Sequence, residues 1–217
     1  MRLIACVISI VILGLVCYWN SLDSPFVFDD IASVERNLTI RDGSASIPTQ
    51  FFARSLLNAT FAWNYAIGGL SVFGFHAVNL WIHILNGLIV FGIALVLFDV
   101  WPAFFASTFF IVHPIQTESV TYISSRSELL STFFYLAALF LFMKWPKAKI
   151  GFILSLLVGI LFLAGMSSKE TVISLPLTIW LYDWLFLSDG RFFGFLKRWR
   201  FYQLNLLGAA FVAAYVL

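Results

Sequence analysis

The sequence predicts an all-α membrane protein that crosses the bilayer several times. Of its 217 residues, 61% are hydrophobic and only 11% are charged, and the mean hydropathy is +0.95. An ordinary soluble domain has about 45–50% apolar and about 25% charged residues. A chain with so little charge cannot cover a water-facing surface. The composition therefore excludes a soluble globular enzyme, a disordered chain and a nucleic-acid-binding protein.

Seven hydrophobic segments approach the length of a membrane span, which is about 20 apolar residues for a hydrocarbon core of about 30 Å. They are residues 3–19, 72–98, 101–123, 129–143, 150–166, 171–187 and 201–217. The first has no clear cleavage site and is interpreted as an uncleaved anchor, with a signal peptide as the alternative. The last is still apolar at its end. This favours a single transmembrane domain over residues 1–217 that is truncated at its C-terminus.

The distribution of Lys and Arg favours a cytoplasmic N-terminus. If all seven segments cross, eight basic residues lie on the inner side and five on the outer side, in keeping with the positive-inside tendency. The inner eight are Arg2, Lys144, Lys147, Lys149, Arg191, Lys197, Arg198 and Arg200. The membrane is then a bacterial inner membrane or that of the endoplasmic reticulum, and the sequence leaves both open.

The segment 101–123 is the weakest of the seven crossings. Pro114 interrupts it, and residues 101–113 alone form only about 20 Å of helix. A re-entrant segment is the alternative, but it would turn the basic cluster at 144–149 outward, against the positive-inside tendency. In a short crossing, residues 113–118 lie below the outer membrane surface. Irregular backbone at that depth is tolerated only around a protein-lined or watery cavity.

Residues 20–69 are the one long polar segment, and we expect a first periplasmic or luminal loop with short helices of its own. Structureless loops of this length are rare in compact domains. Thr49 follows Pro48 and is a candidate cap for a helix through Phe51 and Leu57. The aromatic content of the loop predicts helices that lie in the membrane interface.

Two adjacent carboxylates, Asp29 and Asp30, come soon after the first hydrophobic segment. A carboxylate in such a pair is suited to act as a general base. The pair is also a candidate ligand set for a divalent cation, Mg²⁺ or Mn²⁺, which is the one cofactor that these residues suggest. The structural alternative is that Asp30 caps a short helix beginning at Ile31.

A second polar group follows the proline break, with His113 directly before it. Glu118, Tyr122 and Arg126 are four residues apart, so one continuous helix would place all three on one face. A carboxylate, a phenol and a guanidinium around one cavity suit an anionic, hydroxyl-rich ligand, and the planar guanidinium is well suited to a phosphate. The structural alternative is an ion pair between Arg126 and a neighbouring glutamate.

Lys169 and Glu170 form a third polar group at the outer end of the fifth segment. Lys169 is a candidate phosphate ligand. The alternatives are an ion pair between Lys169 and Glu170, or a lysine whose ammonium reaches the interface from a helix end.

A fourth group lies along the second segment, at His76, Asn79, His83 and Asn86. Their spacings of three, four and three place them on one helical stripe. Two histidines that are seven residues, or about 10 Å, apart are too distant to share one metal ion. The stripe therefore predicts packing against neighbouring helices.

Taken together, these motifs resemble the transmembrane and tetratricopeptide-repeat O-mannosyltransferases, which belong to the GT-C glycosyltransferases. The residues that carry the resemblance are Phe28-Asp29-Asp30, His76-x-x-Asn79-Leu80-x-x-His83-x-x-Asn86, His113-Pro114-x-x-x-Glu118-Ser119-Val120-x-Tyr122-x-x-x-Arg126, and Lys169-Glu170 with Tyr182-Asp183. The resemblance covers most of the chain, although no tetratricopeptide repeat follows within it.

The resemblance implies a GT-C-like fold and an inverting transfer of a sugar, mannose in the first instance, from a polyprenyl-phosphate donor to Ser or Thr hydroxyls of a protein acceptor. Asp29 matches the acidic residue of the first outer loop that serves as the base, and Arg126 matches a position that contacts the lipid phosphate. The predicted site has Asp29, Asp30 and Glu118 as catalytic residues, Arg126 and Lys169 as phosphate ligands, and His113, Tyr122 and Glu170 as further cavity-lining residues.

Two other functions stay open at this point. A transporter or flippase of a lipid-linked or anionic solute would use the same cavity but needs polar groups that open to both sides. The inner side offers only Asp99, Asp183 and Asp189 as acidic groups, which favours one-sided chemistry. A non-catalytic membrane scaffold is the third reading, and it predicts that Asp29 and Arg126 tolerate substitution.

Overall fold

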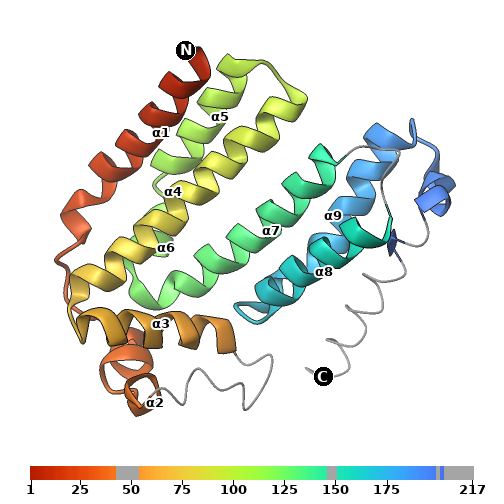
Figure 1. Cartoon of the computed structure of the whole chain (residues 1–217). Helices are drawn as coiled ribbons and strands as arrows, with labels where there is room; N and C mark the ends of the chain where they lie inside the picture. The colour runs from red at the N-terminus through yellow and green to blue at the C-terminus, as the bar shows by residue number, and fades with distance from the viewer. Residues whose placement is uncertain (43–53, 146–150, 199–200, 203–217) are drawn as a thin grey trace.

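The structure is a computed structural model, and the part of the chain that it describes is all-helical (Figure 1). It describes residues 1–42, 54–145, 151–198 and 201–202. Its α-helices are α1 (Arg2–Tyr18), α2 (Leu38–Arg41), α3 (Ser55–Gly68), α4 (Val72–Leu97), α5 (Val100–Val112), α6 (Gln116–Thr121), α7 (Arg126–Lys144), α8 (Phe152–Met166) and α9 (Leu175–Tyr182). In Figure 1, α1, α5 and α4 lie side by side, α7 packs between α4 and α8, and α3 crosses beneath α4 and α7.

Among the described residues, three helices are long and apolar enough to cross a membrane. They are Arg2–Ser21, Val72–Leu97 and Ile123–Lys144, and the bent pair Glu170–Leu187 and Phe192–Arg198 would make a fourth. Helices α5 and α8 are apolar but shorter, with 13 and 15 residues. The chain is therefore a multi-pass helical membrane protein with three or four candidate spans. Seven crossings stay a prediction, and most of the seventh segment lies outside the described residues.

The predicted break at Pro114 is confirmed, and a second break follows it. Helix α5 ends at Val112 and α6 begins at Gln116. Helix α6 in turn ends at Thr121, where Tyr122 takes an extended conformation with φ −93° and ψ 115°. A 3₁₀ turn, Ile123–Ser125, then leads into α7. The expectation of one helix through Glu118, Tyr122 and Arg126 is therefore wrong.

Polar side chains of α4 compensate for these breaks. A helix end leaves carbonyl groups without helical partners, which is costly where water is excluded. His83 Nε2 lies 3.1 Å from the carbonyl oxygen of Ile111, near the end of α5. The Asn79 amide donates to the carbonyls of Tyr122 and Ile123, at 3.3 Å each. The irregular segment is thus held in place from α4.

The two ends of the same stripe act alike. His76 Nε2 lies 3.0 Å from the carbonyl oxygen of Ser24, and the Asn86 amide donates to the carbonyl of Leu129 at 3.0 Å. All four side chains of the stripe are buried. This confirms the prediction that the stripe packs against neighbouring segments.

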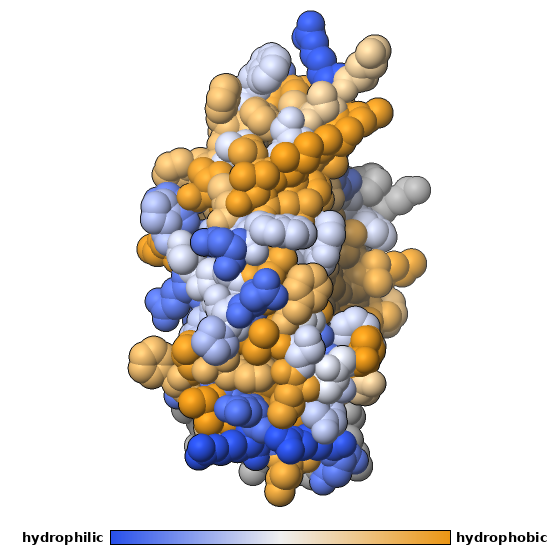
Figure 2. Space-filling view, turned by 90° about the vertical axis from the view of Figure 1, so that its left-hand side faces the viewer, coloured by the Kyte–Doolittle hydropathy of each residue, from blue (hydrophilic) through white to orange (hydrophobic). Residues whose placement is uncertain are grey.

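Helices also occur in the long loop between α1 and α4, as predicted. A π-helical turn, Ile31–Glu35, precedes α2, and α3 follows. The predicted cap Thr49 and the start at Phe51 lie outside the described residues. The loop is packed onto α4 and α7 by a cluster that includes Val34, Ile40, Leu57, Phe61, Phe75, Ile123 and Leu130. Figure 2 shows hydrophobic side chains gathered over the upper part of one face and a hydrophilic band across its lower end, the end where α2 and α3 lie in Figure 1.

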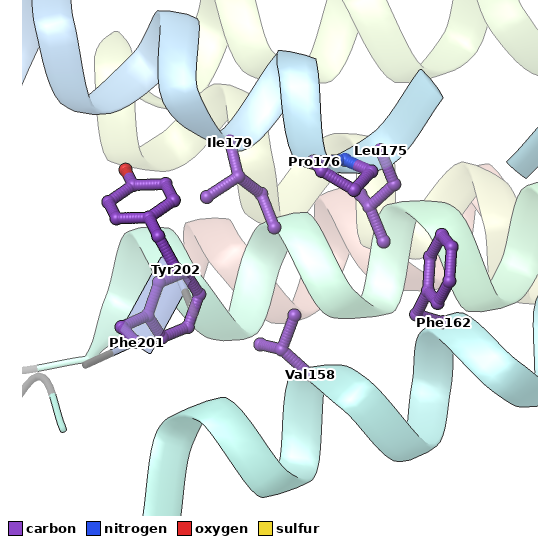
Figure 3. Close-up of a pocket in the computed structure, with 7 residues that line it drawn as sticks. All are labelled: Val158, Phe162, Leu175, Pro176, Ile179, Phe201 and Tyr202. Atoms are coloured by element: carbon purple, nitrogen blue, oxygen red, sulfur yellow. The ribbon is translucent and has the colours of Figure 1, made fainter. Parts of the chain in front are cut away.

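Helices α8 and α9 meet through apolar side chains (Figure 3). The pocket between them is lined by Val158, Phe162, Leu175, Pro176, Ile179, Phe201 and Tyr202. Its volume is about 10 Å³, which is at the limit for a single water molecule. It is a gap in the packing and not a binding site.

Candidate functional site

The Phe28-Asp29-Asp30 motif forms a strained turn. Phe28 has φ 47°, in the left-handed region that a bulky aromatic residue rarely adopts, and its ring is 85% exposed. The Asp30 amide donates to the carbonyl of Val27 at 2.9 Å and closes the turn. Strain of this kind persists only where the surrounding structure holds it, and it is frequent at functional sites.

Hydrogen bonds of the Asp30 side chain hold the strained turn in place. Its side chain is 1% exposed, and Oδ1 accepts hydrogen bonds from the amide and the hydroxyl of Ser124, at 2.7 and 2.6 Å. Oδ2 accepts from the amide of Val27 at 3.3 Å. Asp30 stands at the start of the turn Ile31–Glu35, but its side chain does not cap it. The capping alternative is therefore wrong, because the carboxylate accepts hydrogen bonds from Ser124, in the 3₁₀ turn before α7.

Asp29, in contrast, is exposed and lies beside Tyr122. The Asp29 amide donates to the phenol oxygen of Tyr122 at 2.9 Å. Partial burial of the phenol, together with the carboxylates of Asp29 and Asp30, raises the pKa of Tyr122 above its ordinary value. The phenol is therefore protonated at neutral pH and available as a donor. The turn thus presents one exposed carboxylate next to one protonated hydroxyl.

Arg126 lies at the start of α7 and is 0% exposed. Its Nε donates to the side chain of Asn79 at 2.7 Å, Nη2 to the carbonyl of Phe75 at 2.9 Å, and Nη1 to the carbonyl and hydroxyl of Thr60 at 3.3 Å. The guanidinium carbon is 4.6 Å from the centre of the Phe61 ring, a cation–π contact. Arg126 therefore connects α3, α4 and α7.

The partners of Arg126 are neutral. Neither of the ion pairs given for the described residues includes Arg126, so the alternative of an interfacial pair with a glutamate is wrong. All three guanidinium nitrogens face protein groups in this conformation. Contact of Arg126 with a lipid phosphate stays a prediction, and it requires this arrangement to open.

Lys169 forms an ion pair with Glu128 of α7 and not with Glu170. The Lys169 side chain is 22% exposed and that of Glu128 is 41% exposed. Glu170 begins the 3₁₀ helix Glu170–Ser174 and is exposed. The alternative pairing of Lys169 with Glu170 is therefore wrong in this structure.

The two remaining predicted residues lie around the first break. His113 is half-buried, its Nδ1 accepts from the amide of Ile115 at 3.2 Å, and its ring packs edge-on against Phe109. Glu118 is exposed on α6. The structure thus brings Asp29, Asp30 and Tyr122 together, and it pairs Lys169 with a residue outside the predicted set.

A metal ion has little to bind in the described part of the chain. No group of three His, Cys, Asp or Glu side chains lies close enough there to hold one. Both oxygens of Asp30 already accept hydrogen bonds from the protein, which leaves Asp29 as one free-standing carboxylate ligand. These residues do not fit a bound Mg²⁺ or Mn²⁺, and no chemical step is assigned to a metal.

Sequence reasoning missed two features of this region. Ser124, the partner of Asp30, stands in no recognisable motif. Glu128 was outside the predicted site, yet Glu128, Ser131, Thr132 and Tyr135 follow the spacing of one helical face. That periodicity was a usable signal for a polar face on an otherwise apolar segment.

The fold and the site define a class: a multi-pass helical membrane protein with a braced, exposed carboxylate on the polar loop between its first two long helices. Comparison with known proteins narrows this class. The chain is 33% identical over 149 residues to Protein O-mannosyl-transferase TMTC3 of Homo sapiens, which covers 61% of the chain and 16% of that protein. It is 32% identical over 186 residues to Protein O-mannosyl-transferase F38B6.6 of Caenorhabditis elegans, with 77% and 26% covered.

A third relative, Protein O-mannosyl-transferase Tmtc2 of Drosophila melanogaster, is 29% identical over 196 residues, with 79% of the chain and 21% of that protein covered. The chain is thus homologous to the TMTC protein O-mannosyl-transferases, as its motifs predicted, and it matches between 16% and 26% of the length of these three relatives. No protein-family model and no solved structure matches it.

Proposed function

We propose that this chain is the membrane portion of a protein O-mannosyltransferase that uses a lipid-linked sugar. The donor is a polyprenyl-phosphate mannose and the acceptor a Ser or Thr hydroxyl of a protein, on the outer or luminal face of a bacterial inner membrane or the endoplasmic reticulum, with the N-terminus cytoplasmic. Homology to the O-mannosyl-transferases and the membrane-type helices support this proposal. The observation that carries it is the exposed Asp29 carboxylate, held in place by Asp30 and Tyr122.

In the proposed reaction, Asp29 accepts the proton of the acceptor hydroxyl. The hydroxyl oxygen forms a bond to the anomeric carbon of the sugar, and the bond between that carbon and the phosphate oxygen breaks. The polyprenyl phosphate leaves with the electron pair, and the configuration at the anomeric carbon inverts. A general base of this kind contributes about 10²–10⁴-fold to the rate.

The other residues have supporting roles in this proposal. Asp30 is a positioning residue, because its carboxylate contacts Ser124 and Val27 and not open space. Glu118 is the second candidate for a catalytic carboxylate, since it is exposed on the helix directly before Tyr122. His113 and Glu170 are proposed as further cavity-lining residues, and Lys169 is the proposed ligand of the donor phosphate.

The test is a transfer assay on the full-length gene product, including any sequence beyond residue 217. The protein is incubated with polyprenyl-phosphate mannose and a Ser/Thr-rich peptide, and the peptide mass is measured. We expect a hexose-sized gain that falls at least about 100-fold in Asp29→Asn. The matched control is Asp23→Asn, an exposed aspartate of the same loop, which keeps the wild-type rate.

The alternatives give different results. Transfer retained in Asp29→Asn and lost in Glu118→Gln moves the base to Glu118. No transfer by the wild-type protein, together with movement of the donor across a vesicle membrane, favours the transporter. Neither activity, with Asp29 and Arg126 both tolerant of substitution in cells, favours the scaffold.

A further inference from the structure

A cavity with polar and apolar side chains in its lining lies between α7 and the 3₁₀ helix Glu170–Ser174. Its volume is about 250 Å³, close to the lower end of small-molecule sites. Its polar lining comes from Glu128, Ser131, Thr132 and Tyr135 of α7 and from Thr171 of the 3₁₀ helix Glu170–Ser174, with two aliphatic side chains between them. We call it the α7 cavity.

The lining is unusual for its position. Helix α7 belongs to one of the three candidate spans, and polar side chains on a span either pack against a neighbouring helix or face a polar cavity. The four α7 residues extend over about 10 Å of the helix. One face of this membrane helix thus contributes a carboxylate and three hydroxyl side chains to the cavity lining. The Ser131 hydroxyl donates to the carbonyl of Glu128, and the Tyr135 hydroxyl is bonded to Thr178.

The two ends of the cavity differ. Toward the middle of the span, the hydroxyls of Tyr135 and Thr178 are hydrogen-bonded to each other. Toward the start of α7, Glu128 is paired with Lys169, and both side chains are partly exposed. The charged end is the end that a solute can reach. Ile173 follows the lining residue Val172 and Leu177 precedes Thr178, and both expose apolar side chains that suit contact with lipid.

We propose that the α7 cavity binds the glycosyl-phosphate end of the lipid-linked donor, and that the arriving phosphate takes Lys169 from Glu128. This inference rests on the proposed function, because it locates the donor of that function. A phosphate matches the ammonium of Lys169. The released Glu128 carboxylate and the hydroxyls of Thr132 and Thr171 match the hydroxyls of a sugar, and the prenyl chain lies in the membrane.

If the phosphate replaces Glu128 as the partner of Lys169, substitutions of the two residues should change the Kd of polyprenyl phosphate in opposite directions. Binding of bare polyprenyl phosphate is measured by titration of the full-length protein in nanodiscs. Lys169→Gln removes the cation, and we expect the Kd to rise at least about tenfold. Glu128→Gln removes the competing carboxylate, and we expect the Kd to fall about threefold. Lys144→Gln, at the far end of α7, is the control and leaves the Kd unchanged.

A structural ion pair behaves differently. It predicts that both variants weaken binding together or that neither changes it, and either result overturns the proposal. Thermal unfolding of each variant is measured alongside, so that a misfolded variant is recognised. Lys169→Arg then serves as the second variant, since it keeps the charge and should keep the affinity within about threefold.

The hydroxyl lining is tested with the mannosylated donor. Thr132→Val removes one hydroxyl at nearly constant volume, and we expect the Kd of polyprenyl-phosphate mannose to rise about threefold to tenfold while that of bare polyprenyl phosphate stays unchanged. Thr108→Val is the control, because Thr108 lies on α5 and its hydroxyl has no hydrogen-bond partner among the described residues. Equal effects of Thr132→Val on both ligands contradict a sugar contact.

Two further ligands identify the source of the phosphate. Mannose 1-phosphate and inorganic phosphate carry a phosphate group without the prenyl chain. Weak binding of both supports a lipid-linked ligand, whereas mannose 1-phosphate that binds as tightly as the donor overturns that assignment. Failure of the donor site can be distinguished from failure of the proposed function. Transfer in the peptide assay with donor affinity unaffected by Lys169→Gln refutes the cavity alone, and variant-sensitive donor binding without transfer refutes the transfer alone.

Discussion

Polar side chains on the two faces of α7 lie in different environments. On the face toward α4, Arg126 is fully buried and donates to Asn79, Phe75 and Thr60. On the face toward the 3₁₀ helix Glu170–Ser174, Glu128 and Thr132 line a cavity of about 250 Å³. Both faces carry charge in a candidate membrane span, and on the second face the polar groups line a cavity.

The comparison separates polar groups that build the protein from those that can bind a ligand. A buried group whose hydrogen bonds end on carbonyls and amides is already satisfied, and freeing it costs energy. A partly exposed ion pair costs little to open. The two cations that the sequence predicted as phosphate ligands therefore differ: Lys169 is held by a partly exposed ion pair, and Arg126 by several buried hydrogen bonds.

The largest expected effect is that of Arg126→Lys on stability. A lysine cannot reach Asn79, Phe75 and Thr60 with one planar group, so buried acceptors lose their donor. We expect the free energy of unfolding to fall by about 3 kcal/mol, measured by unfolding of the purified protein. Arg36→Lys, at an exposed position of the loop between α1 and α4, is the control. Unchanged stability combined with weaker donor binding would make Arg126 a phosphate ligand and break the comparison.

The next largest effect separates Asp30 from Asp29. Asp30→Asn keeps the shape of the side chain but removes the charge that Ser124 donates to, and we expect a loss of about 2 kcal/mol in stability. Asp29→Asn should change the stability by less than about 0.5 kcal/mol while it lowers transfer at least about 100-fold. A double-mutant cycle of Asp30→Asn with Ser124→Ala measures the contact directly. Equal stabilities of the two aspartate variants would contradict the assigned division of roles.

A smaller effect is expected for the α4 stripe. Asn86→Leu removes the hydrogen bond to the carbonyl of Leu129. Hydrogen bonds inside membranes contribute only modestly, so we expect a loss of about 1 kcal/mol. The unfolding measurement applied to Arg126→Lys gives the value. A loss as large as that of Arg126→Lys would mean that the stripe, and not the arginine, is the main connection between α4 and α7.

The smallest effect is that of Glu128→Gln on stability. The pair with Lys169 is partly exposed, and such pairs contribute about 0–1 kcal/mol. We expect no measurable change in unfolding, although the same variant changes the affinity for polyprenyl phosphate. A large loss of stability would place Glu128 among the structural groups and remove the contrast between the two faces of α7.

The sequence predicted much of the local structure. Residue type and hydrophobic periodicity are local properties of the sequence. The helical content, the break at Pro114 and the packing role of the stripe from His76 to Asn86 could therefore be predicted. So could the presence of helices in the loop between α1 and α4. These features depend on hydrophobic periodicity and on the chemistry of proline, which hold in any fold.

The site was harder to predict because its geometry depends on distant contacts. The spacing of Glu118, Tyr122 and Arg126 suggested one helix, but the carbonyls of Tyr122 and Ile123 lie outside any α-helix and accept hydrogen bonds from Asn79 of α4. Arg126 looked available for a ligand because no sequence pattern shows how many acceptors surround a guanidinium. Its partners come from two other helices, 47 to 66 residues away.

The sequence by itself determined that this chain is a helical membrane protein, and its motifs related it to the O-mannosyl-transferases. Only the tertiary structure decided which of two identical carboxylates is exposed. Asp29 and Asp30 are chemically the same and adjacent in the chain. They differ because the left-handed turn at Phe28 leaves Asp29 exposed, while Ser124, 94 residues further on, donates both hydrogen bonds that Asp30 Oδ1 accepts.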